Sequence, residues 1–386
     1  MPLTAQPDPI PILSPEDLAR VRAPLARSST LPPAAYTDAR VFDVEVDTVF
    51  GRDWVCVARQ EQLSDAGDYV CVDLPGQPIV VARGRDGGLR AFSRICLHRA
   101  MPVAEGAGNA TRFVCPYHHW TYELDGSLRS APMMEGAEGF EASRCRLPAL
   151  RLEVWQGFVF VNRDPDAAAL APRLAGLEAL IRPYGFGELV VAATTEFDSP
   201  WNWKILVENF MEAYHHIGTH STTFEPVYPA RSSSVPDNGG APWTFLRMPG
   251  KPSPDGGEVA LFPALHGDER HQLVAANVYP TLLFAASAAG AFWYQLEPRA
   301  HDAMNLKIHV LLPGPVADAM DDDARAGAVE LVRGIHFEDI PANEGPWLGL
   351  HGKMTGQGRL SPYEKAIWQL NQLWLDRVES RLLGRR

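Results

Sequence analysis

Two short segments of the chain pair a cysteine with a histidine at close spacing. The first reads Cys-x-His at Cys96 and His98, and the second reads Cys-x-x-His at Cys115 and His118, with sixteen residues between the two segments. A [2Fe–2S] cluster bound by two thiolates on one iron and two imidazoles on the other needs this ligand set, with each pair on one short loop. The sequence therefore predicts such a cluster. A zinc ion bound by the same four side chains is the alternative.

A second histidine motif lies in the second half of the chain. It reads His-x4-His at His215 and His220, with Glu212 three positions before the first histidine. Two histidines and one carboxylate that leave coordination positions open are the ligand set of non-haem Fe(II) oxygenases. Alone this spacing is typical of surface helices, but behind a cluster site it predicts an iron centre that receives electrons. Five residues do not keep two side chains on one helix face, so we expect the helix to end or bulge near Gly218 and His216 to point away from the metal.

These motifs belong to a longer pattern, on which the chain resembles the large (α) subunits of Rieske non-haem iron oxygenases, the ring-hydroxylating family. The resemblance covers most of the chain and also rests on Trp54, 120–122, Asp125, Gly126, 155–162, 202–204, 278–280 and 338–340. The chain departs from the family at His119, where a small residue is usual, and at 343–346, which read Asn-Glu-Gly-Pro where relatives tend to carry a Gln in a continuing helix. The resemblance implies an α+β fold, with a small all-β Rieske domain and a larger catalytic domain whose antiparallel sheet is covered by helices.

The resemblance also implies the remaining iron-site residues. Asp339 matches the position of the carboxylate that completes the iron ligands, and Glu338 is its local alternative. Asn209 matches a position beside the iron, where we expect it to support catalysis. The implied reaction uses O2 and electrons from the cluster to oxidise a substrate C–H or C=C bond.

The resemblance assigns Glu212 a link between the two metal sites. In the family, an acid at this position hydrogen-bonds a cluster histidine of a neighbouring subunit, which here would be His118. The alternative is that Glu212 only supports His215, with which it shares a helix face. Transfer of electrons between subunits needs a head-to-tail interface that closes into a ring. We therefore expect a homotrimer, as in the family.

The substrate is predicted from the side chains that are candidates for the lining of a pocket. The sequence offers six candidates for the lining of a pocket, namely Phe210, Tyr279, Leu283, Phe284, Phe292 and Tyr294. Such a lining suits an aromatic ring, and it also suits a quaternary ammonium group through cation–π attraction. A glutamate at position 212, where many relatives have aspartate, resembles the branch that oxidises quaternary amines such as carnitine and betaines, and it favours that branch. The alternatives are an aromatic-ring cis-dihydroxylating dioxygenase and a non-catalytic Rieske electron-transfer protein, although a carrier would need only one small domain.

Composition limits the partners. The chain of 386 residues carries a net charge of −12, which argues against binding to nucleic acids or anionic membranes. No apolar run approaches the length of a membrane-spanning helix, and the first 33 residues lack the pattern of a targeting peptide. Beyond the two cluster cysteines, Cys56, Cys71 and Cys145 are scattered, which predicts free thiols in the cytoplasm. No nucleotide-binding glycine motif is present, so we expect a separate reductase or ferredoxin to deliver electrons from NAD(P)H.

The chain reads as an N-terminal arm (1–40) that packs on the catalytic domain, a Rieske domain (41–165) and a catalytic iron domain (166–386). Alternating and β-branched residues predict strands, and apolar residues at helical spacing predict a long C-terminal helix. A segment rich in glycine, proline and serine predicts a mobile loop. These elements are strands at 68–74, 78–83, 189–197 and 305–312, helices starting at Ser14 and over 361–382, and the loop at 232–258.

Overall fold

The computed structural model describes residues 11–251 and 261–384. The chain forms two compact units, one of residues 52–170 and one of residues 1–51 with 171–386. The domain limits predicted from the sequence, 1–40, 41–165 and 166–386, stay predictions. Among the described residues, no helix is both long and apolar enough to cross a membrane.

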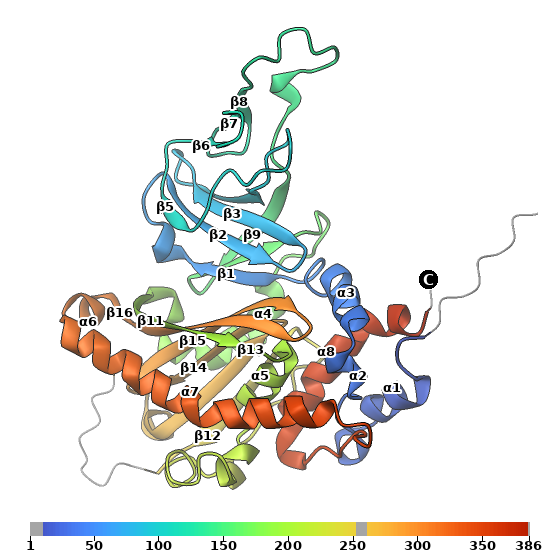
Figure 1. Cartoon of the computed structure of the whole chain (residues 1–386). Helices are drawn as coiled ribbons and strands as arrows, with labels where there is room; N and C mark the ends of the chain where they lie inside the picture. The colour runs from blue at the N-terminus through green and yellow to red at the C-terminus, as the bar shows by residue number, and fades with distance from the viewer. Residues whose placement is uncertain (1–10, 252–260, 385–386) are drawn as a thin grey trace, which may run out of the picture. The chain divides into compact units, whose positions relative to one another are not determined.

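The smaller unit is built from antiparallel strands. Its main sheet has the order β1-β10-β9-β4-β3-β2-β5, and a second sheet has the order β6-β7-β8 (Figure 1). The strands of the main sheet are β1 (Val55–Arg59), β2 (Asp68–Leu74), β3 (Gln77–Arg83), β4 (Leu89–Ser93), β5 (Ala107–Asn109), β9 (Ala149–Trp155) and β10 (Phe158–Asn162). The second sheet has β6 (Phe113–Val114), β7 (Thr121–Tyr122) and β8 (Leu128–Ser130). The two strands predicted here, 68–74 and 78–83, are confirmed as β2 and β3.

The larger unit contains one antiparallel sheet of six strands in the order β11-β16-β15-β14-β13-β12. These strands are β11 (Leu189–Ser199), β12 (Trp243–Pro249), β13 (Gln272–Val278), β14 (Leu282–Ser287), β15 (Gly290–Ala300) and β16 (Ala303–Pro313). The predictions at 189–197 and 305–312 are confirmed as β11 and β16. In β16 the apolar face that includes Leu306 and Ile308 is buried as expected, but Asn305 and His309 on the other face are buried too.

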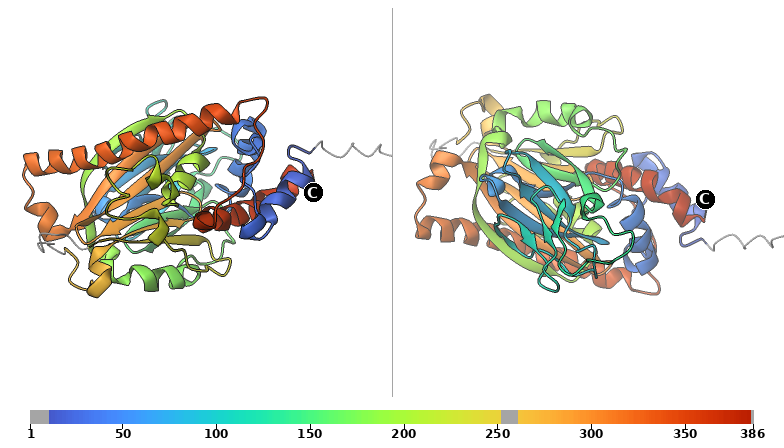
Figure 2. Two further views of the ribbon diagram at one scale, coloured as in Figure 1. Left: turned by 90° about the horizontal axis from the view of Figure 1, so that it is seen from below. Right: turned by 90° about the horizontal axis from the view of Figure 1, so that it is seen from above.

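The helices of the larger unit are α1 (Pro15–Arg22), α2 (Ala34–Thr37), α3 (Ala39–Thr48), α4 (Ala171–Ile181), α5 (Trp203–Phe210), α6 (Gly314–Asp318), α7 (Asp322–Leu350) and α8 (Lys365–Leu382). Helix α7 packs against β11 and β16, and both α1 and α3 lie beside α8 (Figure 2). The helix predicted from Ser14 is confirmed as α1. It begins there because the Ser14 hydroxyl caps it by accepting a hydrogen bond from the Asp17 amide at 3.1 Å. Arg22 of α1 pairs with Asp376 and Glu379 of α8, which attaches the N-terminal segment to the larger unit.

One local prediction needs correction, and one departure from the family pattern leaves the fold unchanged. The predicted loop at 232–258 contains the strand β12, whose residues Phe245 and Leu246 are buried; its segment 252–260 lies outside the described residues. Around 343–346, where the chain departs from the family pattern, α7 nevertheless continues through Pro341 and Pro346 to Leu350. The predicted C-terminal helix is confirmed as α8, which begins at Lys365 after the 3₁₀ turn Pro362–Glu364.

Candidate active site

The cluster motifs lie on two loops at one end of the smaller unit. The first loop follows β4, and the second joins β6 to β7. Each loop turns tightly, because the Cys96 amide donates to the Met101 carbonyl at 2.9 Å and the Cys115 amide donates to the Trp120 carbonyl at 2.8 Å. His119, one of the departures from the family pattern, has φ of +59°. Glycine adopts that left-handed conformation most easily, and among the other residues histidine adopts it more often than most, so His119 is compatible with this turn.

The four predicted cluster ligands divide into two buried cysteines and two histidines near the surface, of which His98 is exposed and His118 is half-buried. Cys96 and Cys115 are 3% and 1% exposed, whereas His98 and His118 lie at the surface with their Nδ1 atoms 3.2 Å apart. Burial raises the pKa of the Cys96 thiol, and a hydrogen bond with the Tyr122 hydroxyl opposes that rise. The side chains therefore suit a cluster with one iron inside the protein and the other near solvent.

The two histidines of the second motif do not lie on one continuous helix. Helix α5 begins after Asn202, whose side chain accepts from the Lys204 amide, and ends at Phe210. A 3₁₀ turn, Tyr214–Ile217, follows and carries His215, and His220 lies in the next turn. The helix therefore ends at Phe210, well before Gly218, where the sequence predicted its end or a bulge. This break brings the two imidazoles together despite their five-residue spacing.

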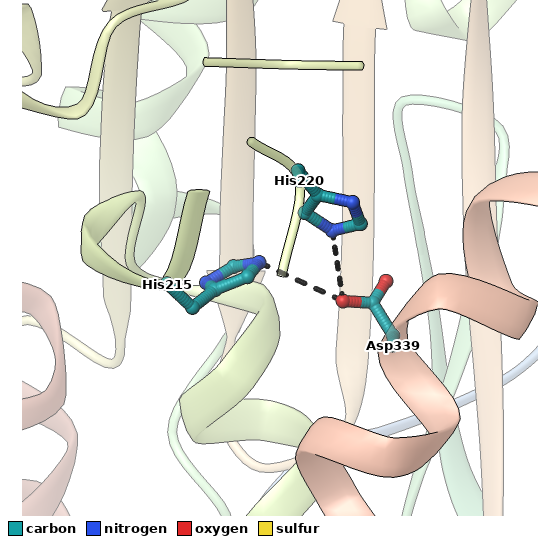
Figure 3. Close-up of side chains that lie close together, drawn as sticks. All are labelled: His215, His220 and Asp339. Atoms are coloured by element: carbon teal, nitrogen blue, oxygen red, sulfur yellow. Dashed lines mark hydrogen bonds and ion pairs between the residues drawn. The ribbon is translucent and has the colours of Figure 1, made fainter. Parts of the chain in front are cut away.

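His215, His220 and Asp339 converge on one point (Figure 3). Asp339 comes from the middle of α7, and its Oδ1 lies 3.0 Å from His220 Nε2 and 3.6 Å from His215 Nε2. All three potential ligand atoms lie within 4.8 Å of one another. Two neutral imidazoles and one carboxylate at these separations fit a single Fe(II), so the arrangement could hold the predicted ion.

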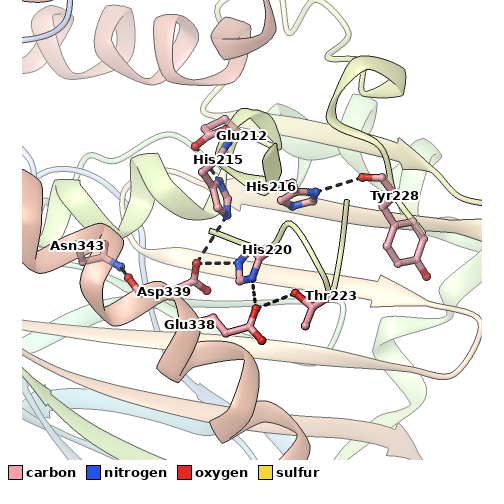
Figure 4. Close-up of polar contacts among 9 residues, drawn as sticks. All are labelled: Glu212, His215, His216, His220, Thr223, Tyr228, Glu338, Asp339 and Asn343. Carbon is pink, nitrogen blue, oxygen red and sulfur yellow. Dashed lines mark hydrogen bonds and ion pairs between the residues drawn. The ribbon is translucent and has the colours of Figure 1, made fainter. Parts of the chain in front are cut away.

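Two glutamates hold the outer sides of the imidazoles (Figure 4). Glu212 lies 2.7 Å from His215 Nδ1, and Glu338 lies 2.6 Å from His220 Nδ1. Metal-binding histidines usually present one nitrogen to the ion and the other to such a carboxylate. The contacts leave both Nε2 atoms facing Asp339, so Asp339 is suited to bind the predicted ion, whereas Glu338 lies behind a histidine.

Hydrogen bonds among these histidines and carboxylates shift their pKa values. Burial lowers the pKa of His220, but its hydrogen bonds to Asp339 and Glu338 outweigh burial and raise the pKa overall. Burial raises the pKa of Glu338, while hydrogen bonds from His220 and Thr223 outweigh it and lower the pKa overall. His216 is turned the other way, with Nδ1 3.2 Å from the Tyr228 carbonyl, and burial lowers its pKa to about 4. His216 is therefore neutral at pH 7.

A cavity of about 280 Å³ adjoins the converging side chains. Its wall includes residues of α5, of α7 and of the sheet face formed by β12 to β15, and Asn209, Glu212, His215, His220 and Asp339 border it. Three predicted pocket residues also line it, namely Phe210, Phe292 and Tyr294. A largely apolar cavity next to a ligand set with open positions is the arrangement of a small-molecule active site.

The other three predicted pocket residues are buried outside the lining of this cavity. Phe284 is on the opposite face of β14 from Ala285 and packs against Phe186, with ring centroids 4.6 Å apart. Leu283 shares the face of Ala285 but is paired with Asn277, farther along the sheet. Tyr279 follows the end of β13, and the Arg377 guanidinium lies over its ring. Strand alternation turns Phe284 away from the cavity, whereas Leu283 and Tyr279 lie farther along the sheet than the strand residues that line it.

Sequence reasoning missed two aromatic residues of the wall, Phe224 and Tyr228. With His216 and His220 they recur at every fourth position, and hydrogen bonds join the Phe224 amide to the His220 carbonyl and the Tyr228 amide to the Phe224 carbonyl. This four-residue spacing is the signal that could have found them, because it places side chains on one face of a helical turn.

Comparison with known protein families identifies both domains. Residues 53–145 match the Rieske [2Fe–2S] domain, which excludes the zinc alternative for this domain. Residues 186–380, half of the chain, match the ring hydroxylating alpha subunit catalytic domain. The chain belongs to the ring-hydroxylating α-subunit family. As members of this family do, it combines a [2Fe–2S] domain with a catalytic domain that binds a mononuclear iron.

Curated relatives of this ring-hydroxylating α subunit include enzymes of quaternary amines. The carnitine monooxygenase oxygenase subunit of Escherichia coli K12 is 38% identical over 209 residues, 53% of this chain and 54% of that protein. The glycine betaine monooxygenase oxygenase subunit of Pseudomonas aeruginosa PAO1 is 31% identical over 194 residues, 50% of this chain and 45% of that protein. The matched region thus spans about half the length of these relatives.

Solved structures show the same fold over nearly the whole chain. A quaternary ammonium Rieske monooxygenase, described with carnitine oxidation and inter-subunit electron transfer, has a TM-score of 0.80 at 24% identity and covers 97% of this chain and 100% of its own. Naphthalene 1,2-dioxygenase from Rhodococcus sp. has a TM-score of 0.76 at 22% identity and covers 96% and 97%. The α+β architecture predicted from the sequence is confirmed.

Proposed function

We propose that the protein is a terminal oxygenase that hydroxylates or oxidatively dealkylates a small organic substrate, a quaternary amine or an aromatic compound. The observation that carries the proposal is the convergence of His215, His220 and Asp339 beside a cavity of about 280 Å³. In a hydroxylation, one atom of O2 enters a substrate C–H bond, and two electrons and two protons reduce the other atom to water. Hydroxylation next to a nitrogen gives a hemiaminal, which breaks down with loss of the alkyl group.

The side chains divide this work. His215, His220 and Asp339 would hold Fe(II), which when bound supplies open coordination positions for O2. Glu212 and Glu338 fix the two imidazole rings through their Nδ1 atoms. Asn209 borders the same cavity and would support the reacting groups from the α5 side. The apolar wall would exclude water from the substrate, and this limits side reactions with solvent.

Electrons would reach the iron through the cluster bound by Cys96, His98, Cys115 and His118. The surface position of the two histidines supports electron exchange across a protein interface. Glu212 would bridge its own His215 to the partner subunit's His118, which supports a homotrimer as the functional assembly. A separate reductase or ferredoxin would supply the electrons from NAD(P)H. Cysteines without disulfide bonds suit work in the cytoplasm.

Two alternatives lead to different measurements. A cis-dihydroxylating dioxygenase would place both atoms of O2 in the product, which labelling with ¹⁸O2 detects. A non-catalytic electron carrier would bind about two irons per chain, whereas the oxygenase would bind about three. The cavity beside the converging ligands favours the oxygenase, because a carrier has no use for it.

The bridge is tested by replacing Glu212 with glutamine, which keeps the size of the side chain but removes its charge. We expect both metal sites to stay loaded and the cluster to be reduced normally, while electron transfer to the iron slows at least about tenfold. The measurement is reoxidation of the pre-reduced, fully iron-loaded enzyme in a single turnover with substrate and O2.

The matched control is Glu338→Gln. Glu338 holds His220 as Glu212 holds His215, through one hydrogen bond to Nδ1, but it is not expected to contact the cluster. Once loaded with iron, this control should transfer electrons at close to the wild-type rate. If both variants or neither slowed the transfer, the bridge through Glu212 would be wrong.

A further inference from the structure

The charged side chains that line the cavity beside the proposed iron site are acidic, and a bound Fe(II) would add two positive charges. Glu212 and Asp339 are acidic, and no lysine or arginine is present among the described residues that line the cavity. The remaining wall is mostly apolar or aromatic. Because Glu212 and Asp339 together offset the two positive charges of a bound Fe(II), a substrate carboxylate would meet neither a basic side chain nor a net positive charge there.

Basic residues on nearby elements are engaged elsewhere. The Arg333 guanidinium lies over the rings of Phe197 and Phe337 and donates to the Thr195 hydroxyl at 3.1 Å. Arg247 borders a different cavity, where Asp268 and Glu269 also lie. The segment 252–260, which the structure does not describe, contains two acidic residues and no basic one in the sequence. It therefore adds no cationic side chain to the cavity.

Aromatic side chains provide the cavity with a different means of recognition. Phe210 and Tyr294 have ring centroids 4.8 Å apart, and Phe224 and Tyr228 have centroids 6.2 Å apart. Phe292 also lines the cavity. Aromatic faces attract ammonium groups, most strongly in sites shielded from water. A buried carboxylate without a partner is costly, whereas an ammonium group is compensated by such rings and by nearby carboxylates.

We infer that the substrate is a small ammonium cation that carries no carboxylate. The inference rests on the proposed function, because it concerns the substrate of the same iron site. Carnitine and glycine betaine, named for the relatives, are zwitterions that contain a carboxylate besides the quaternary ammonium group. This chain would share their ammonium chemistry and differ in what it accepts at the other end of the molecule.

Two matched ligand pairs test the inference by isothermal titration calorimetry on the iron-loaded enzyme without O2. The first pair is γ-butyrobetaine and its primary amide, which differ only in the carboxylate; we expect the amide to bind at least about tenfold more tightly. The second pair is choline and its neutral carbon isostere, 3,3-dimethylbutan-1-ol; we expect choline to bind at least about fivefold more tightly. A reversed or equal order in either pair, or no measurable binding of choline and the amide, overturns the inference.

A substitution at the cavity edge tests the same inference from the protein side. Leu331 of α7 lines the cavity but is 60% exposed, so a longer polar side chain is tolerated there. Leu331→Arg should strengthen γ-butyrobetaine binding at least about fivefold and weaken choline binding. The neutral control Leu331→Gln should keep the wild-type preference for choline. An arginine variant with the preference of the glutamine variant would overturn the charge argument.

Binding and turnover separate this inference from the function on which it rests. If the cationic ligands bind in the expected order but none is oxidised with O2 and a reductase, the proposed function fails and the selectivity of the cavity stands. If γ-butyrobetaine is oxidised and binds at least as tightly as its amide, the oxygenase function stands and the inference about the substrate fails.

Discussion

The two metal sites of this chain differ in how far their ligands are exposed. In the smaller unit, the proposed cluster histidines are at the surface and only the cysteines are buried. In the larger unit, His220 is 1% exposed, Asp339 is buried and His215 is half-buried, and a cavity rather than bulk solvent adjoins them. The first arrangement suits exchange of electrons with another protein, and the second suits chemistry on a small molecule that must be shielded from water.

The difference also extends to how the ligands are supported. Backbone hydrogen bonds of tight turns hold the cluster loops, whereas carboxylates hold the iron-site imidazoles. A loop motif can therefore be recognised from a few neighbouring residues. The iron site depends on side chains that are more than a hundred residues apart, such as His220 and Glu338.

The largest expected effect comes from breaking the buried half of the cluster site. Cys96→Ser should abolish the visible absorption and the reduced-state EPR signal of the cluster, because a hydroxyl replaces a thiolate ligand. The mononuclear iron should remain, since the four cluster ligands are separate from His215, His220 and Asp339. Cys71→Ser, which changes a cysteine outside the motif, is the control. A normal Rieske EPR spectrum in Cys96→Ser would rule out the assignment.

The next effect concerns the choice of carboxylate in the iron site. Asp339→Ala should remove turnover and mononuclear iron while leaving the cluster spectrum unchanged. Glu338→Ala should bind iron about 10- to 100-fold more weakly but recover activity in excess Fe(II), because Glu338 bonds the outer nitrogen of His220 and the Thr223 hydroxyl and does not face the two Nε2 atoms. Iron titrations with activity assays distinguish the two. Activity retained in Asp339→Ala and lost in Glu338→Ala would identify Glu338 as the ligand.

The sequence predicted the chemistry of the sites better than their surroundings. The cluster motif and the two iron histidines could be named because the metal restricts the ligand type, whereas Asp339 could be preferred to Glu338 only through the family resemblance. The end of α5 at Phe210 was not predicted, since nothing in the local sequence marks a break before Gly218. Only three of the six residues predicted for the pocket line the cavity. Residue type shows that a side chain is apolar, but its face of the strand and its place along the sheet decide whether it reaches the cavity.

The pH dependence of stability tests how burial affects a histidine close to the proposed iron site. His336, one turn before Asp339 in α7, is fully buried, and neither ring nitrogen has a hydrogen-bond partner among the described residues. Burial lowers its pKa from 6.5 to about 4, whereas Asp339 opposes this shift. Between these values the unfolded chain binds the proton more strongly, so the folded state should lose up to about 3 kcal/mol as pH falls from 6.5 to 4.

His336→Phe should remove this contribution while keeping a ring beside Phe197, whose centroid is 4.4 Å away. Urea unfolding of the larger unit at pH 7.5 and pH 5 measures the effect. The variant should show a smaller difference between the two pH values than the wild type, and its stability at pH 5 should be higher relative to wild type than at pH 7.5. Equal pH dependence in both proteins would contradict the role of His336.

The smallest expected effect concerns the buried hydrogen bond between Tyr122 and the cluster cysteine Cys96. The Tyr122 hydroxyl lies 3.3 Å from Cys96 Sγ and accepts a hydrogen bond from the Leu97 amide at 3.0 Å. A donor to a cluster sulfur stabilises the reduced cluster more than the oxidised one, because reduction adds negative charge. Tyr122→Phe keeps the buried ring, and loss of one hydrogen bond of about 1 kcal/mol should lower the one-electron potential by about 40 mV. Tyr117→Phe, at an exposed ring beside His118, is the control. An EPR-monitored redox titration that finds equal potentials for Tyr122→Phe and the wild type would show that the buried hydroxyl does not tune the cluster.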